Sequence, residues 1–160
     1  MEFNKENCDK LISLLSKDKD NDENFDMFMD LLRSYLELYD HLKEINVLPE
    51  TFKTDTKVMF ELIKIVYCDE EIIKEISNED DSHFNKDEMN EYLEFVDNVS
   101  YICENIDTFD SNDDVLSEKL KNVAIFFDKK QEDMKKLNEA MDNLGNTLDE
   151  VYKTLEKINN

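Results

Sequence analysis

Residues 116–158 read LSEKLKNVAIFFDKKQEDMKKLNEAMDNLGNTLDEVYKTLEKI and carry the strongest structural pattern in the chain. The apolar residues of this pattern recur at steps that alternate between three and four, with Lys130 as the only polar residue in the series. A period of 3.5 residues is typical of a helix that packs along another helix. One half of the repeat consists of Leu120, Phe127, Met134, Met141, Leu148 and Leu155. The stretch therefore predicts one long helix that contacts other helices.

The two halves of this stretch differ in how far apolar surface extends around the helix. From Val123 to Phe127 every residue is apolar, as in a helix that is buried on most sides. After Asp128 the apolar residues narrow to the repeat itself. We therefore predict that residues 1–127 form a helical bundle and that residues 128–160 form a C-terminal helical extension with one packing edge.

The packing edge of the extension is the candidate partner-binding site. Its residues are Met134, Leu137, Met141, Leu144, Leu148, Val151, Leu155 and Ile158. The positions beside it are mostly small or uncharged, among them Ala140, Gly145 and Thr147, whereas an isolated parallel dimer usually carries opposite charges there. The pattern favours packing in a multi-helix bundle or against a helix of another protein, and a homodimer is the alternative.

The composition of the chain predicts an all-α protein. The 160 residues include one Gly and one Pro, which favours long helices with few tight turns. Apolar residues make up 40% of the chain, which is enough to bury a core. We predict an antiparallel bundle of about five helices. The helices are expected near residues 5–16, 25–45, 55–76, 86–106 and 115–158, with a break at 68–71 and a linker at 46–54 around Pro49.

The charge of the chain lies mainly in residues 1–127. The net charge is −22, and residues 1–127 hold 33 acidic against 13 basic side chains, while residues 128–160 hold eight against six. Such a balance excludes binding to nucleic acid through its phosphates and disfavours anionic membranes. A basic protein is the electrostatically favoured partner. An alternative function is therefore an acidic inhibitor that imitates nucleic acid, of the viral or phage counter-defence type. Asp87, Glu91 and Glu94 would share one side of a helix in such an inhibitor.

The first acidic connection resembles the start of an EF-hand calcium loop. The matching residues, at positions one, three, five, seven and nine of that loop, are Asp18, Asp20, Asp22, Asn24 and Asp26. Glu23 stands in place of the family's glycine, and Met29 stands in place of its bidentate glutamate. A second stretch, residues 77–88, can be aligned in the same way. The resemblance implies a degenerate calcium-responsive protein as a third hypothesis.

Other sequence features favour a non-enzymatic intracellular protein without a cofactor. Cys8, Cys68 and Cys103 have no close spacing, which suits reduced thiols in the cytoplasm. The N-terminus is polar and acidic, unlike a secretory signal, and no apolar run approaches the length of a membrane span. His41 and His83 form no metal-binding motif, and a single glycine nearly excludes a phosphate-binding loop.

Overall fold

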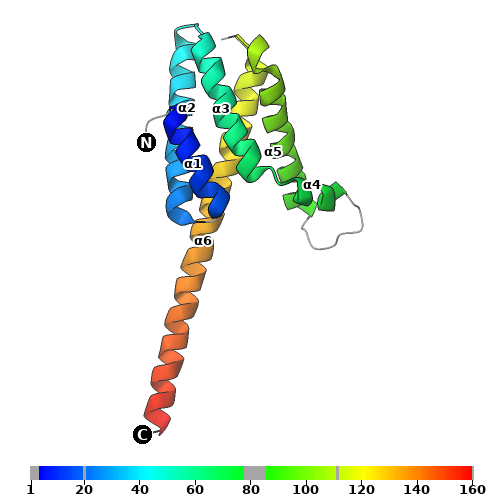
Figure 1. Cartoon of the computed structure of the whole chain (residues 1–160). Helices are drawn as coiled ribbons and strands as arrows, with labels where there is room; N and C mark the ends of the chain where they lie inside the picture. The colour runs from blue at the N-terminus through cyan, green and yellow to red at the C-terminus, as the bar shows by residue number, and fades with distance from the viewer. Residues whose placement is uncertain (1–3, 20, 78–85, 111, 160) are drawn as a thin grey trace. The chain divides into compact units, whose positions relative to one another are not determined.

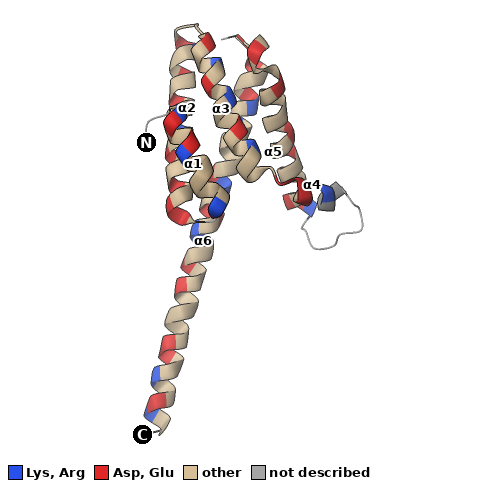
Figure 2. Ribbon diagram, in the orientation of Figure 1, with Lys and Arg blue, Asp and Glu red and all other residues tan. Residues whose placement is uncertain are grey.

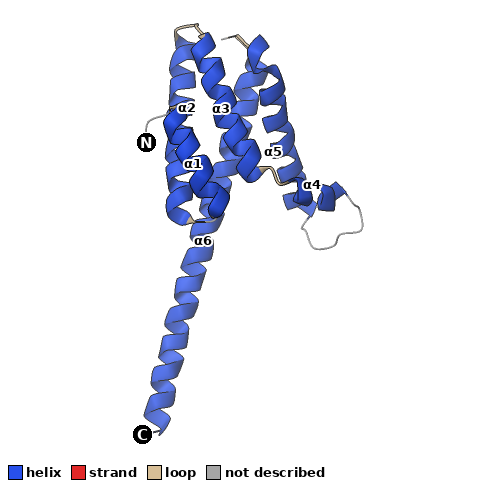
Figure 3. Ribbon diagram, in the orientation of Figure 1, coloured by secondary structure: helices blue, strands red, loops and turns tan. Residues whose placement is uncertain are grey.

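The computed structural model of the chain describes residues 4–19, 21–77, 86–110 and 112–159, and within these ranges every regular element is helical (Figure 3). The elements are α1 (Lys5–Lys17), α2 (Asp22–Glu44), α3 (Glu50–Tyr67), α4 (Glu70–Ser77), α5 (Lys86–Asn105), the short 3₁₀ helix η1 (Ile106–Thr108) and α6 (Asp114–Asn159). The predicted all-α bundle with a long C-terminal helix is confirmed. The expected break in the third segment separates α3 from α4, which gives six α-helices in the described residues in place of about five.

The chain divides into two compact units, residues 1–127 (unit 1) and residues 128–160 (unit 2). In unit 1, α2, α3, α5 and the first turns of α6 run alongside one another in alternating directions, and α1 packs beside α2 and α3 (Figure 1). This is the antiparallel arrangement expected for helices joined by short connections.

Side-chain caps explain several of the helix starts. The Asn4 side chain accepts a hydrogen bond from the Asn7 amide at 2.8 Å, and the Asn21 side chain accepts one from the Asn24 amide at 3.1 Å. Before α6, the Asp113 carboxylate accepts from the amides of Val115 at 3.0 Å and Leu116 at 3.1 Å. Each acceptor satisfies an amide that has no carbonyl partner inside its helix. Residues 85–88 read Asn-Lys-Asp-Glu, which is typical of a capping box, but Asn85 lies outside the described residues.

Two helix starts differ from the prediction. Helix α2 begins at Asp22, three residues before the predicted start, because Asn21 caps it and the acidic residues Asp22 and Glu23 in its first turn suit the helix dipole. Helix α3 begins at Glu50, five residues early, with Pro49 in the N-cap position at φ −63°. Since the first amides of a helix have no internal partner, a proline there loses no hydrogen bond. The linker predicted for residues 46–54 is therefore only 45–49.

Backbone conformation and backbone hydrogen bonds end helix α2 at Glu44, before the chain reaches Pro49. Asn46 adopts φ 63°, a left-handed conformation that asparagine tolerates better than most residues. The Asn46 amide donates to the Lys43 carbonyl and the Val47 amide to the Leu42 carbonyl, each at 3.1 Å. These two bonds form a Schellman motif, which satisfies carbonyls at the end of the helix.

An aromatic cluster forms the centre of unit 1. The ring centroid of Phe127 lies 4.8 Å from that of Phe28 (α2), 4.9 Å from that of Tyr67 (α3) and 5.3 Å from that of Phe95 (α5). Each pair has a T-shaped or edge orientation. Phe126 stacks on Phe95 at 3.9 Å. Edge and offset ring contacts add to the apolar area that these side chains bury. The last residues of the repeat within unit 1 are thus the point where three other helices meet.

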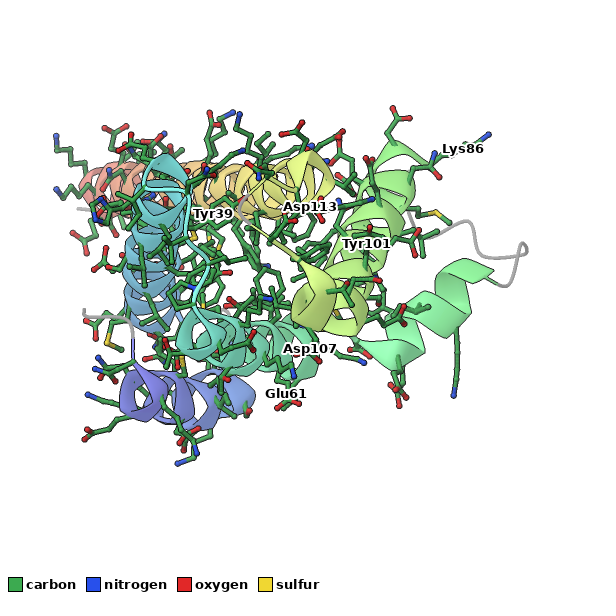
Figure 4. All side chains as sticks on the ribbon, turned by 90° about the horizontal axis from the view of Figure 1, so that it is seen from above. Tyr39, Glu61, Lys86, Tyr101, Asp107 and Asp113 are labelled. Atoms are coloured by element: carbon green, nitrogen blue, oxygen red, sulfur yellow. The ribbon has the colours of Figure 1, made fainter. Side chains whose placement is uncertain are left out.

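Polar contacts join the helices around this core. The Tyr35 hydroxyl lies 2.9 Å from the buried Thr56 hydroxyl, which also donates to the Phe52 carbonyl at 2.8 Å. The Ser117 hydroxyl lies 2.6 Å from the Tyr39 hydroxyl and accepts from the Lys43 ammonium at 2.6 Å. Figure 4 looks along the bundle and places Tyr39 and Asp113 at the end where α6 begins. These contacts fix the start of α6 against α2.

The expectation that residues 123–127 are buried on most sides is only partly met. Val123 and Phe127 are fully buried and Phe126 is half-buried, but Ile125 is 63% exposed. The helices of unit 1 cover one broad face of this segment, and Ile125 falls on the opposite side. The apolar run at residues 123–127 is therefore not buried on every side of the helix.

Candidate partner-binding site

The described residues of unit 2 form one helical segment, the part of α6 from residue 128 to Asn159, and include no second element that could cover its packing edge. In heptad notation, Met134, Met141, Leu148 and Leu155 occupy the a positions, and Leu137, Leu144, Val151 and Ile158 occupy the d positions. We call these eight residues the seam. Met134 is half-buried, and the other seven are between 48% and 72% exposed.

The same repeat is buried where it lies in unit 1. Leu116, Leu120, Val123 and Phe127 are at most 2% exposed. Monomeric proteins rarely expose a contiguous apolar surface of this length, and such surfaces usually mark interaction sites. The seam is therefore the strongest candidate for a functional site in unit 2.

Two threonines that flank the seam already donate their hydroxyl hydrogens within the helix. The Thr147 hydroxyl donates to the Asn143 carbonyl and the Thr154 hydroxyl to the Glu150 carbonyl, each at 2.9 Å. Both donors are satisfied inside the helix, so burying the two threonines would leave neither hydroxyl hydrogen without an acceptor. Charged pairs such as Lys136 and Glu132, 3.3 Å apart, lie away from the seam.

Gly145, the one glycine of the chain, lies beside the seam in the interior of α6. A glycine inside a helix costs about 1 kcal/mol relative to alanine. A Cβ atom built at this position would have no described neighbour within 4 Å, and the residue has no positive φ. Neither packing inside this chain nor backbone conformation accounts for the glycine.

The EF-hand-like residues do not form a twelve-residue loop. Asp18 is the C-cap of α1, Asp22 is the first residue of α2, and Asp26 lies on the exposed side of α2. Asp20 lies outside the described residues, as does most of the second aligned stretch. Met29, at the position of the bidentate glutamate, is a core residue. Within the ranges described, no group of three or more His, Cys, Asp or Glu is placed to hold a metal ion. Calorimetric titration with Ca²⁺ remains the test of this hypothesis.

Unit 1 contains an open groove of about 550 Å³ that the sequence did not predict, lined by Val66 (α3), Ile73 (α4) and Val96 (α5) together with Cys68. Burial raises the pKa of the Cys68 thiol to about 11 and that of Cys8 likewise, and it raises the pKa of Cys103. These thiols are protonated at neutral pH, and a protonated thiol is a poor nucleophile. The groove is also lined by Lys64, Asp69, Glu70 and Ser100, so its lining is mixed, and its one thiol is not activated.

Acidic residues occur along each helix of unit 1, with fewer basic residues between them (Figure 2). On α5, Asp87, Glu91 and Glu94 are all exposed, and their spacing keeps them on one side of the helix. In η1, which follows α5, Asp107 pairs with Lys57 at 2.7 Å. The acidic surface that the sequence predicts therefore includes a row along the first turns of α5.

No protein family, characterised protein or solved structure shows significant similarity to this chain. In the part of the chain that the structure describes, no helix combines the length and the apolar character that crossing a membrane requires.

Proposed function

We propose that this protein is a non-enzymatic protein–protein interaction module that engages partner helices through the seam. One observation carries the proposal: the heptad repeat continues without interruption from Met134 to Ile158, and seven of its eight side chains stay largely exposed. An apolar stripe of this period is complementary to another helix and to few other surfaces. A module of this kind acts as an adaptor, a scaffold or an inhibitor, according to what it holds.

The free thiols and the charge of the chain support a reducing, cytoplasmic setting for this module. The acidic surface of unit 1 would discourage contacts with other acidic proteins. The seam, in contrast, has uncharged neighbours over most of its length, so binding there would depend on apolar contact more than on charge.

The test is a seam variant with two added charges, Leu144→Asp with Leu148→Asp. The matched control is Asn143→Asp with Asn146→Asp, which adds the same charge on the outer face of the same turns. Proteins retained by the immobilised wild-type chain and by the control should be lost with the seam variant, because a buried unpaired carboxylate is strongly unfavourable. The thermal unfolding of unit 1 should be unchanged in both variants. Loss of folding in the seam variant alone would show that the seam is core and would refute the proposal.

A second candidate function is an acidic inhibitor that imitates nucleic acid, and the row of Asp87, Glu91 and Glu94 favours it. Such an inhibitor would bind a basic nucleic-acid-binding protein, and its affinity would fall steeply with salt because the contacts are between charges. Replacing the three residues with Asn and Gln should weaken binding to a nuclease at low salt. Binding that is unchanged at high salt would count against this function.

A further inference from the structure

We infer that the occupant of the seam is the seam of a second copy of this chain, paired in antiparallel orientation. The inference rests on the proposed function, because it names the partner of the same site. It is carried by the order of the seam residues, the charges beside them and the position of Gly145.

The seam is self-complementary when it is read in opposite directions. In an antiparallel pair, a positions of one helix lie in the same layers as d positions of the other. When the pair is centred at Asn146, all eight seam residues of each copy take part, and none of them lies opposite a polar side chain. The layers are Met134 with Ile158, Leu137 with Leu155, Met141 with Val151 and Leu144 with Leu148, each formed twice.

A parallel pair is less favourable for two electrostatic reasons. It would extend to Lys130, a d position, and would place two lysines opposite each other in one layer. It would also attach both copies of unit 1, each with 33 acidic and 13 basic side chains, at the same end. In the antiparallel pair the two points of attachment at residue 128 are about 54 Å apart, several times the screening length of about 8 Å at physiological salt.

The flanks of the seam permit self-association and offer little to a partner of complementary charge. From Asn138 to Thr154 the flanking positions are uncharged: Asn138, Ala140, Gly145, Thr147, Tyr152 and Thr154. Two copies therefore meet without like charges facing each other, although the chain as a whole is strongly acidic. Helices that select a different partner usually do so through charges at these positions.

Gly145 has a physical explanation in this arrangement. Beside the centre of the antiparallel pair, Gly145 of one copy faces Gly145 of the other, and Ala140 faces Thr154. Small residues there allow the two backbones to approach closely. A helical glycine that nothing within the chain requires thus lies where a second copy comes nearest.

The area is sufficient for a dimer of moderate affinity. Twenty-five helical residues span about 37 Å, and a strip of this length on a helix about 10 Å across buries on the order of 1,200 Å² over both copies. That is the lower end of the range for specific interfaces. We therefore expect dissociation in the micromolar range and not an obligate dimer.

The first experiment measures the mass of the full chain by size-exclusion chromatography with light scattering up to roughly 100 µM, since micromolar dimers dissociate on dilution. We expect a dimer that persists at high salt and becomes a monomer in the Leu144→Asp, Leu148→Asp variant. A monomer at every concentration, or a dimer that the variant leaves intact, overturns the inference. If a monomeric wild type still retains proteins through the seam, the proposed function stands; if it retains none, both fail.

Orientation is measured with spin labels on the outer face, in a chain whose three cysteines are replaced by alanine. Two variants are prepared. One carries its label at Asn146→Cys, and the other carries its label at Glu132→Cys. The antiparallel pair predicts a separation of roughly 25 Å at residue 146 and more than about 40 Å at residue 132, because residue 132 lies 14 residues from the centre. Equally short separations would show a parallel pair and overturn the inference.

A second pair of variants keeps the native cysteines. Gly145→Gln, on the packing side, should weaken dimerisation about tenfold, although glutamine is the better helix former. Asn146→Gln, one residue further on the outer face, should leave the dissociation constant unchanged. Equal dissociation constants for the two variants would contradict the close approach at Gly145.

Discussion

The repeat in residues 116–127 and the repeat in residues 134–158 belong to one helix and have the same period, yet the first is buried and the second is exposed. Leu120 and Leu148 both occupy a positions, and their side chains are 2% and 50% exposed. In unit 1 the repeat contacts aromatic side chains of α2, α3 and α5, whereas residues 128–159 of unit 2 form one helix without a second element. The difference teaches that a heptad pattern specifies which face of a helix will be covered, but not by what.

The largest expected effect is the difference in stability between two matched truncations, Leu120→Ala and Leu148→Ala. Leu120→Ala should lower the free energy of unfolding of unit 1 by about 2–5 kcal/mol, because it removes buried methyl groups and leaves a cavity. Leu148→Ala should change it by less than about 0.5 kcal/mol, as expected for an exposed side chain. Near-ultraviolet circular dichroism during urea unfolding reports on unit 1, since all ten Phe and five of the six Tyr lie in residues 1–127.

The control for this comparison is the protein concentration. Both variants are measured at concentrations where the chain is monomeric, so that a loss of self-association at Leu148 does not enter the result. If Leu148→Ala destabilised unit 1 as strongly as Leu120→Ala, the two repeats would belong to one core, and the contrast between them would be lost.

Much of the fold could be predicted from the sequence because the pattern of α6 and the near absence of Gly and Pro act in the same direction. The narrowing of the apolar stripe after Asp128 also coincides with the boundary between the two units. Helix starts were less predictable. Pro49 suggested a break, but a proline is as compatible with the position just before a helix, and only the backbone distinguishes the two.

The acidic run at residues 18–26 is the clearest case in which local chemistry had two interpretations. Alternating aspartates are typical of a calcium loop, and acidic residues are also favoured in the first turn of a helix. The burial of Phe25, Phe28 and Met29 against other helices favours the helix, and no single-sequence pattern expresses that tertiary contribution. The groove beside Cys68 was unpredictable for the same reason, because it depends on how three helices meet.

A smaller effect distinguishing the two regions is expected at alkaline pH. Burial raises the pKa of the Cys8 and Cys68 thiols from 9.0 to about 11, and both lie in unit 1. Below pH 9 the thiols are protonated in the folded and the unfolded state, so stability does not depend on them. Between pH 9 and 11 the unfolded thiols lose protons that the folded ones keep, so the stability of unit 1 should fall as pH rises.

The measurement is the unfolding midpoint of unit 1, followed by near-ultraviolet circular dichroism from pH 8 to 11. Replacing Cys8 and Cys68 with alanine should flatten the decline, although not abolish it, because burial also raises the pKa of Tyr35, Tyr39 and Tyr92. An equally steep decline without the two thiols would show that they do not contribute.

The smallest expected effect is that of removing unit 2. A chain that ends at Asp128 keeps every residue of the aromatic cluster and the contacts of Ser117 with α2, so its unit 1 should unfold within about 0.5 kcal/mol of the full chain. Its helical circular dichroism should fall by the share of the residues removed, and it should be monomeric at all concentrations. A truncated chain that failed to fold would place the seam in the core and remove the basis of both proposals. A truncated chain that folded and still dimerised would instead assign self-association to unit 1, and the exposed repeat would then be left for the helix of another protein.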